Sequence, residues 1–285
     1  MLVSERIGQL FLGSGDRLEF TEYGGGERWV LLLHGELLTR RMHQPLARRL
    51  AAEGLHVVTL DLLGHGRSDR PGDPLAYSVP SFADHVVALL DHLGAEQALL
   101  GGVSLGANVA LEAAVRAPER VRGLLLESPV LDNGFAAALT CLAPLMVGAR
   151  TLPVAFSGLR RASRAVPRGI VPFWAGVALD VVNQRADAVA AMLHGVLFGR
   201  LAPDSAARRT IEVPALVLGH RGDLARPWSD VRMLADELPR ARAVRTRGPW
   251  EWRLDPARLD GEAVSFALDV WDARGTRRRR RRSSR

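Results

Sequence analysis

The sequence predicts an α/β fold in which a doubly wound, mostly parallel sheet carries a helical cap insertion. Short apolar runs recur along the chain and alternate with segments of helical periodicity, which is the pattern of right-handed βαβ units. Between Asp132 and Arg209 the apolar runs stop and only helical patterns remain, so this segment is expected to be inserted between two strands. A length of 285 residues suits one large domain of this class.

The elements can be placed in order along the chain. The first residues alternate as in a hairpin, with strands at 8–12 and 17–23 around the turn Gly13-Ser14-Gly15-Asp16. Apolar runs such as WVLLL and HVVTLD then predict buried strands, and a glycine such as Gly94 ends a helix. On these criteria strands are expected at 29–33, 56–61, 97–103, 121–127, 214–219 and 241–247, and helices at 42–52, 80–93, 105–116, 229–238 and 256–273.

These elements divide the chain into three parts. Residues 1–132 and 210–273 form the α/β core, 133–209 form the helical cap, and 274–285 form an arginine-rich tail that we expect to be disordered. The tail holds eight arginines and therefore contributes a charge of +8. Because the whole chain has a net charge of +7, the rest of the chain carries −1. Such a tail can contact nucleic acid or an anionic membrane, but a solvated, dispensable tail is the stronger interpretation.

Composition also bounds the location of the protein. The first residues, MLVSERIG, include Glu5 and no apolar core, so no secretory signal is expected. The longest uncharged run, 135–149, is too short to span a membrane and contains Pro144. The single Cys141 excludes an internal disulfide and fits a reducing compartment. We therefore expect a cytoplasmic protein.

One motif carries chemistry. GGVSLGAN contains Gly102-Val103-Ser104-Leu105-Gly106, a G-x-S-x-G pattern with a buried strand before it and a helix after it. The glycines allow the tight turn that lifts a serine above the end of the sheet, at a helix N-terminus that favours negative charge. The alternative is a tight turn that happens to contain a serine. The context favours Ser104 as a nucleophile.

A second motif lies where the strand WVLLL ends. It continues as His34-Gly35-Glu36, and a backbone N–H at this point can be offered to an oxyanion. We expect the N–H groups of Glu36 and Leu105 to form the oxyanion hole. His34 itself is expected to be structural and buried beneath the loop.

A third motif, DLLGHGRSDRP at 61–71, is a glycine-rich turn after a strand. With HG after the third strand, GVSLG at the serine and VPALVLGHRGD before a late helix, the chain resembles the α/β-hydrolase superfamily from residue 1 to about 273. The resemblance implies a serine nucleophile, a late acid, a later histidine, a helical cap, a small-molecule substrate and no cofactor or metal.

The resemblance assigns two residues by position. Ser104 matches the nucleophile, and Asp223 in GHRGD matches the acid that orients the histidine. Asp223 is alternatively a solvated loop residue. Glu127, which ends a sheet strand before the cap, is the other candidate acid.

The histidine is where this chain departs from the family. The matching position lies in RTRGPWEWRL, where Pro249 follows Gly248, and no histidine occurs after His220. An isolated serine hydroxyl is a weak nucleophile, so a replacement base is required. Three are conceivable: His220, on a loop at the same face as Ser104; Glu36; and Glu251, which alternation along PWEWRL directs toward solvent.

The leading hypothesis is a serine hydrolase for a small, mainly apolar ester or related acyl compound. Serine at position 104 argues against haloalkane or epoxide opening through an aspartyl ester. Residues 133–179 contain arginines but no acid, which suits a substrate with a negative group, although a solvated arginine face is favoured. The alternatives are a degenerate hydrolase fold that binds a ligand or partner without turnover, and a protein whose tail associates with nucleic acid or membrane.

Overall fold

The computed structural model describes residues 3–220, 222, 223, 227–248 and 250–282. Their strands form one eight-stranded sheet in the order β1-β2-β4-β3-β5-β6-β7-β8. The pairs β1–β2 and β2–β4 are antiparallel, and all the others are parallel, which confirms the mostly parallel sheet. The strands are β1 (Glu5–Phe11), β2 (Arg17–Tyr23), β3 (Trp29–Leu33), β4 (His56–Leu60), β5 (Ala98–Val103), β6 (Val121–Glu127), β7 (Ala215–Gly219) and β8 (Ala241–Arg245).

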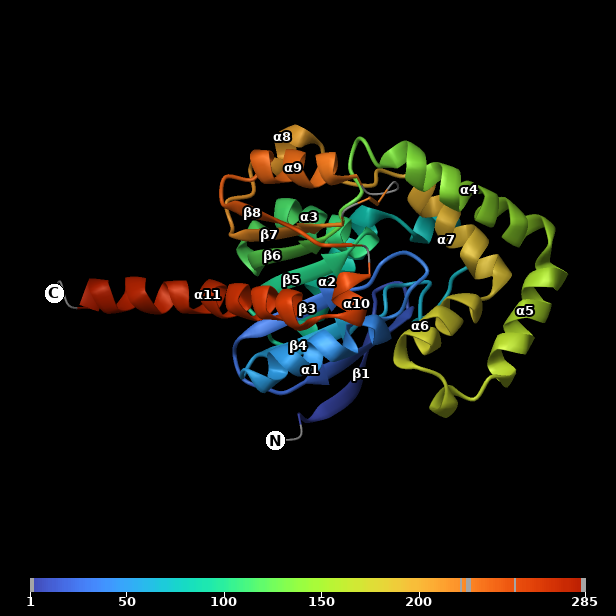
Figure 1. The fold of residues 1–285 in the computed structure, drawn as a ribbon, viewed down its shortest axis with the longest axis horizontal. Coiled ribbons are helices and arrows are strands. Elements are labelled where there is room, and N and C mark those ends of the chain that lie inside the picture. The colour runs from blue at the N-terminus through green and yellow to red at the C-terminus, as the bar shows by residue number, and fades with distance from the viewer. Residues whose placement is uncertain (1–2, 221, 224–226, 249, 283–285) are drawn as a thin grey trace.

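Helices cover both faces of the sheet, as expected for a doubly wound fold (Figure 1). One core cluster contains apolar residues of α2, α3 and α9, and the other contains those of α1 and α11. Alternation along β3 explains the two layers, because Leu31 and Leu33 pack in the first cluster while Val30 and Leu32 pack in the second. The core helices are α1 (Gln44–Ala52), α2 (Val79–His92), α3 (Leu105–Arg116), α9 (Trp228–Glu237), α10 (Glu251–Leu254) and α11 (Ala257–Arg282).

The cap lies at one end of the sheet, as Figure 1 shows, and is helical as the sequence predicts. Asp230 on α9 fixes its first residues: the carboxylate is fully buried and accepts hydrogen bonds from the N–H groups of Leu131, Asn133 and Gly134. The cap helices are α4 (Phe135–Thr151), α5 (Pro153–Ala165), α6 (Phe173–Val182) and α7 (Ala186–Phe198); α8 (Ser205–Arg208), which the sequence analysis placed in the cap, lies beside α9 on the core (Figure 1).

Asn108 on α3 also holds the cap. Its amide nitrogen donates to the carbonyl oxygens of Val130 and Leu201, at 2.8 and 2.7 Å, and its amide oxygen accepts from the N–H of Val130. Val130 precedes the cap helices and Leu201 follows α7, so one buried side chain joins both ends of the cap to the helix that follows Ser104.

The last helix, α11, differs from the prediction at its C-terminal end. We expected a helix to 273 and a disordered tail beyond it, but the described backbone is helical to Arg282. Arginine has a high intrinsic helix propensity, so a run of arginines prolongs a helix that is already formed. Within the described part of the chain, no single helix is long and apolar enough to cross a membrane; α4 and α5 reach the required length only together, and they meet at 100°.

Candidate active site

Ser104 lies in a strained turn between β5 and α3. Its backbone angles are φ 52° and ψ −113°, a region that L-residues rarely occupy. A Cβ atom added to Gly102 would lie 2.2 Å from the carbonyl carbon of Gly106, and one added to Gly106 would lie 2.2 Å from the oxygen of Leu33. Both positions therefore require glycine, and the tight strand-to-helix turn predicted from G-x-S-x-G is present.

The loop after β3 lies against this turn. A Cβ atom added to Gly35 would lie 3.6 Å from Ser104 Cβ and 3.3 Å from the oxygen of Val103. Over the described ranges, neither Glu36 N–H nor Leu105 N–H donates to a carbonyl of a turn or loop. Leu105 is also the first residue of α3, where an N–H has no partner within the helix. The loop after β3 thus lies next to the Ser104 turn, and the oxyanion hole formed by the N–H groups of Glu36 and Leu105 stays a prediction.

His34 holds this loop in place. It is fully buried; Nδ1 donates to the carbonyl of Gly35 at 2.9 Å, and Nε2 accepts from the N–H of Leu62 at 3.0 Å. Burial and the neighbouring His65 keep the pKa of His34 well below its usual value, so the ring is neutral. Both nitrogens are used, which agrees with the predicted structural role.

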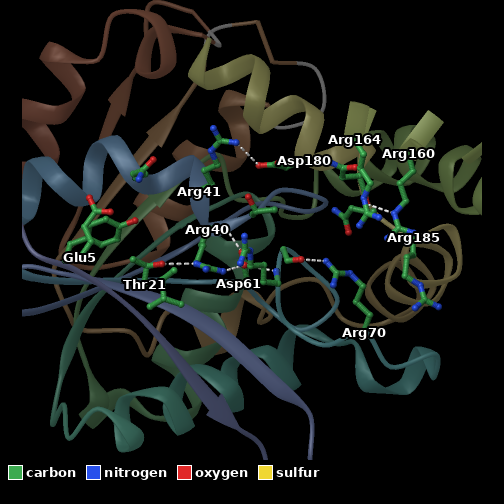
Figure 2. Close-up of a pocket in the computed structure, with 18 residues that line it drawn as sticks. Glu5, Thr21, Arg40, Arg41, Asp61, Arg70, Arg160, Arg164, Asp180 and Arg185 are labelled. Atoms are coloured by element: carbon green, nitrogen blue, oxygen red, sulfur yellow. Dashed lines mark hydrogen bonds and ion pairs between the residues drawn. The ribbon is translucent and has the colours of Figure 1, made fainter. Parts of the chain in front are cut away.

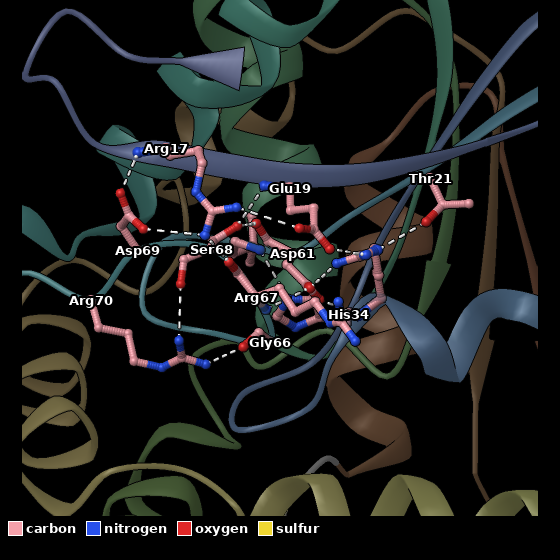
Figure 3. Close-up of polar contacts among 12 residues, drawn as sticks. Arg17, Glu19, Thr21, His34, Asp61, Gly66, Arg67, Ser68, Asp69 and Arg70 are labelled. Atoms are coloured by element: carbon pink, nitrogen blue, oxygen red, sulfur yellow. Dashed lines mark hydrogen bonds and ion pairs between the residues drawn. The ribbon is translucent and has the colours of Figure 1, made fainter. Parts of the chain in front are cut away.

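Asp61 organises the loop of the third motif (Figure 3). Its carboxylate accepts from the N–H groups of Arg40 and Arg67, at 2.7 and 2.9 Å, and forms an ion pair with the Arg40 guanidinium. Gly66 has φ 49°, and a Cβ atom there would lie 2.1 Å from Asp61 Cγ. The glycine-rich turn is therefore needed for the chain to wrap around a buried carboxylate.

Glu36 meets a residue that the sequence analysis missed. His65 Nε2 lies 3.4 Å from Glu36 Oε1, and the His65 side chain is fully buried. The Glu36 side chain is 9% exposed, and neither carboxylate oxygen has a hydrogen bond within the described part of the chain. His65 Nδ1 is bound to the carbonyl of Leu63 at 3.0 Å. The motif letters LGHG mark His65, but nothing in them indicates Glu36 as its neighbour.

His220 lies in a buried network with Glu127. Its Nε2 is 2.9 Å from Glu127 Oε1, and its Nδ1 is 2.9 Å from Thr246 Oγ1. Glu127 also accepts two hydrogen bonds from Arg253 Nη2, at 2.8 and 2.7 Å. Burial alone would raise the pKa of Glu127, but Arg253 and His220 outweigh burial and hold it at about 2. Both ring nitrogens of His220 are thus engaged, and neither contacts Ser104 in the described structure.

The remaining predicted residues are Asp223, Pro249 and Glu251. Asp223 is partly buried and follows β7. Pro249 lies outside the described residues. Glu251 does not face solvent as expected: its side chain is buried, and it accepts hydrogen bonds from Arg258 Nε at 2.7 Å and from Arg247 N–H. The hydrogen bonds from Arg258 lower the pKa of Glu251, so it is a poor base.

Arg253 is a second residue that the sequence analysis missed. Its guanidinium lies 5.4 Å from the ring centre of Trp174 on α6 and 5.6 Å from that of Trp252. It lines a small cavity of about 90 Å³ together with Met42 and Val103, the residue before Ser104. A guanidinium cannot accept a proton, but it places positive charge beside the serine turn. In the described part of the chain, no group of three or more His, Cys, Asp or Glu side chains could hold a metal.

Comparisons with known proteins bear on the fold and the family. A family model described as alpha/beta hydrolase fold matches residues 28–243. A 2-hydroxymuconate semialdehyde hydrolase from Pseudomonas sp. (strain CF600) is 37% identical over 125 residues, which are 43% of this chain and 44% of the relative. A haloalkane dehalogenase 2 from Mycobacterium bovis is 27% identical over 233 residues, 80% of this chain and 71% of the relative. In the first of these, the chain matches less than half of the relative's length.

A solved structure has the same architecture. The enol-lactonase from Burkholderia xenovorans LB400 superposes with a TM-score of 0.74 over 92% of this chain and 100% of the other, at 22% identity. That identity supports the fold and not an activity. The family model covers most of the chain, and the mostly parallel eight-stranded sheet with flanking helices accords with it. The chain belongs to the α/β-hydrolase fold family.

Proposed function

We propose that the protein is a serine hydrolase that cleaves a small ester or related acyl compound. Ser104 Oγ would attack the carbonyl carbon, and the N–H groups of Glu36 and Leu105 would hold the oxyanion. The observation that carries this proposal is the strained backbone of Ser104, at φ 52° between two obligatory glycines. Strain of about 1–3 kcal/mol persists only where the surrounding structure imposes it, which is typical of functional sites.

The chemistry follows from the turn. Attack by Ser104 Oγ forms a tetrahedral oxyanion, expulsion of the leaving group forms an acyl-serine, and water then releases the acid. Each backbone donor in such a hole is worth on the order of 3 kcal/mol in the transition state. Serine favours this acyl route over the alkyl-ester route that an aspartate would provide. A hydrolase and a dehalogenase among the relatives support bond hydrolysis in general.

A second function is favoured by a specific observation. A base must take the proton from Ser104, but His220 is bound to Glu127 and Thr246, and Glu251 is held by Arg258. In the described structure, Ser104 makes no side-chain hydrogen bond at the start of α3. These contacts favour a protein that binds a small molecule or partner at the serine turn without turnover. Loss of a base removes several orders of magnitude in rate, although an oxyanion hole alone leaves some activity.

One experiment separates the two functions. Intact-protein mass spectrometry after a fluorophosphonate probe measures whether Ser104 is activated, with Ser104→Ala as the control for labelling elsewhere. A stoichiometric adduct that Ser104→Ala abolishes supports the hydrolase. No adduct on folded wild-type protein would reject the hydrolase in favour of the binding function.

The same assay locates the base. His220→Ala, Glu36→Gln and Glu251→Gln are labelled beside the wild type, and each labelling rate is measured against pH. Loss of labelling in His220→Ala would mean that the ring leaves Glu127 during reaction. If His220→Ala keeps its labelling and Glu36→Gln loses it, the base would be the Glu36 carboxylate. Circular dichroism on each variant distinguishes loss of the base from loss of the fold.

A further inference from the structure

A large cleft lies between the cap and the edge of the core, away from the serine turn. Its volume is about 920 Å³, and its lining comes from β1, β2, residues 39–44 after β3, the loop after β4, and cap residues between 160 and 185. Neither Ser104 nor any residue of its turn lines it. Figure 2 shows Arg160 and Arg164 on the cap side, and Arg40, Asp61 and Arg70 on the core side. The cleft is large enough for an organic molecule.

The cleft has an excess of positive charge. Seven of its described lining residues are arginines and three are acids, and each acid is paired with an arginine. Arg185, another lining arginine, is paired with Asp187. The acid pairs are Glu5 with Arg48, Asp61 with Arg40, and Asp180 with Arg41.

Four arginines remain without a carboxylate. Within the described ranges, Arg67, Arg70, Arg160 and Arg164 form no ion pair, although they line the same cleft. Backbone carbonyls orient two of them: Arg70 donates to the oxygens of Ser68 and Gly66, and Arg160 donates to Asn183 at 3.1 Å. These contacts fix the side chains without neutralising them.

Guanidinium groups from the core and the cap influence one another. Burial lowers the pKa of Arg70; the nearby Asp61, which is itself paired with Arg40, raises it in part, and Arg160 lowers it. Burial and the neighbouring Arg164 lower the pKa of Arg160. Like charges gathered from two separate parts of the fold raise the free energy of the empty cleft, and an anion that pairs with them would lower it.

We propose that this cleft binds a phosphorylated small molecule, with its phosphate groups between Arg67 and Arg70 of the core and Arg160 and Arg164 of the cap. Four uncompensated cations match the charge of two phosphates better than that of one carboxylate. The planar guanidinium pairs with two phosphate oxygens at once. A volume of about 920 Å³ leaves room for the organic part of the ligand.

Isothermal titration calorimetry of the full chain with pyrophosphate tests the proposal. The arginine-rich tail also binds anions, so the comparison is between variants that all keep it. Arg160→Gln/Arg164→Gln removes the cap side of the cleft, and Arg161→Gln is the matched control because it lies exposed on the same helix and does not line the cleft. We expect the double variant to bind pyrophosphate at least about tenfold more weakly, and Arg161→Gln to bind as the wild type does.

Further variants test the cleft from its core side and separate it from the serine turn. We expect Arg67→Gln to weaken pyrophosphate binding from the core side. If the double variant folds poorly, Arg164→Gln alone is measured in its place, and it should also weaken binding. Ser104→Ala should bind pyrophosphate like the wild type, because the cleft excludes the serine turn; this result stands whether or not the protein is a hydrolase. Equal affinity of the wild type and every cleft variant would assign all binding to the tail and overturn the proposal.

Vesicles identify the source of the phosphate. Flotation with vesicles of phosphatidic acid in phosphatidylcholine, and of phosphatidylcholine alone, is run with the same variants. Loss of phosphatidic acid binding in Arg160→Gln/Arg164→Gln, but not in Arg161→Gln, would support a lipid headgroup as the ligand. Vesicle binding that the cleft variants leave unchanged, together with weakened pyrophosphate binding, would support a free phosphorylated compound.

Discussion

Glu127 Oε1 lies 2.9 Å from His220 Nε2, at the ends of the neighbouring strands β6 and β7. An ionised carboxylate only accepts hydrogen bonds, so Nε2 must carry a proton. Nδ1 contacts Thr246 Oγ1, just after β8, so the ring joins the ends of three adjacent strands. Ser104 N–H donates to the carbonyl of Glu127 at 2.9 Å, which ties this bridge to the serine turn through the backbone.

We predict that Glu127→Gln destabilises the protein by about 3 kcal/mol at pH 7, because it removes a buried carboxylate and leaves the partly buried Arg253 without its counter-charge. The carboxylate has a pKa of about 2 in the fold against 4.5 as its ordinary value. Its contribution to stability is therefore complete above about pH 4.5 and is lost as the pH falls toward 2. Urea unfolding at pH 7 and at pH 3 measures the difference in unfolding free energy between the wild type and Glu127→Gln. This difference should be smaller at pH 3; an equal difference at both pH values would contradict the ionic role.

Buried His43 makes the protein sensitive to weak acid. Burial lowers the pKa of His43 from 6.5 to about 4, so between these values the unfolded chain binds a proton that the folded chain does not. Stability is complete above pH 6.5 and falls by about 3 kcal/mol toward pH 4 from this residue alone. His43→Gln keeps a donor for the carbonyl of Leu33 and should unfold with a flatter pH dependence. The exposed His92→Gln should follow the wild type; equal slopes in all three proteins would reject the prediction.

The serine turn does not tolerate a methyl group at Gly106. Gly106→Ala places Cβ 2.2 Å from the carbonyl oxygen of Leu33, and neither backbone segment can move away, so we expect a loss of about 3 kcal/mol. Gly158→Ala is the matched control, since Gly158 lies in α5 and an added Cβ meets nothing within 4 Å. Removing a helical glycine should raise stability by about 0.5–1 kcal/mol. Thermal unfolding of both variants checks the opposite signs.

The start of the cap depends on Asp230. Asp230→Ala leaves the N–H groups of Leu131, Asn133 and Gly134 without an acceptor, and we expect a loss of about 3 kcal/mol. Asp236→Ala, on the exposed face of the same helix, should change stability by less than about 0.5 kcal/mol. Hydrogen exchange should also rise in residues 131–135 of Asp230→Ala. Unchanged exchange there would mean that other contacts hold the cap.

Local patterns were sufficient to predict the fold. The helix α3 and the strand β6 begin and end where they were expected, since a glycine-rich turn and an unbroken apolar run mark their limits. The Ser104 turn was predictable for the same reason, because five consecutive residues determine it. The end of α11 was not, since a charge run that indicates a solvated tail also has high helix propensity.

The polar contacts of the site were much less predictable. His220 and Glu127 are 93 positions apart, and Arg253 is 126 positions from Glu127. Their meeting depends on the alignment of β6 with β7 and on the path of the chain before α11, which no local pattern contains. Glu251 was assigned to the solvent side by strand alternation, but it lies in the short helix α10, where alternation does not apply.

Asn108 binds the backbone on both sides of the cap, at Val130 and Leu201. The insertion therefore leaves and rejoins the core at two points that one side chain holds together. We expect that a different helical segment can be grafted between those points if its first residues still offer N–H groups to Asp230. Such an exchange would replace the helices at this end of the sheet, while β5, the Ser104 turn and α3 keep their own sequence.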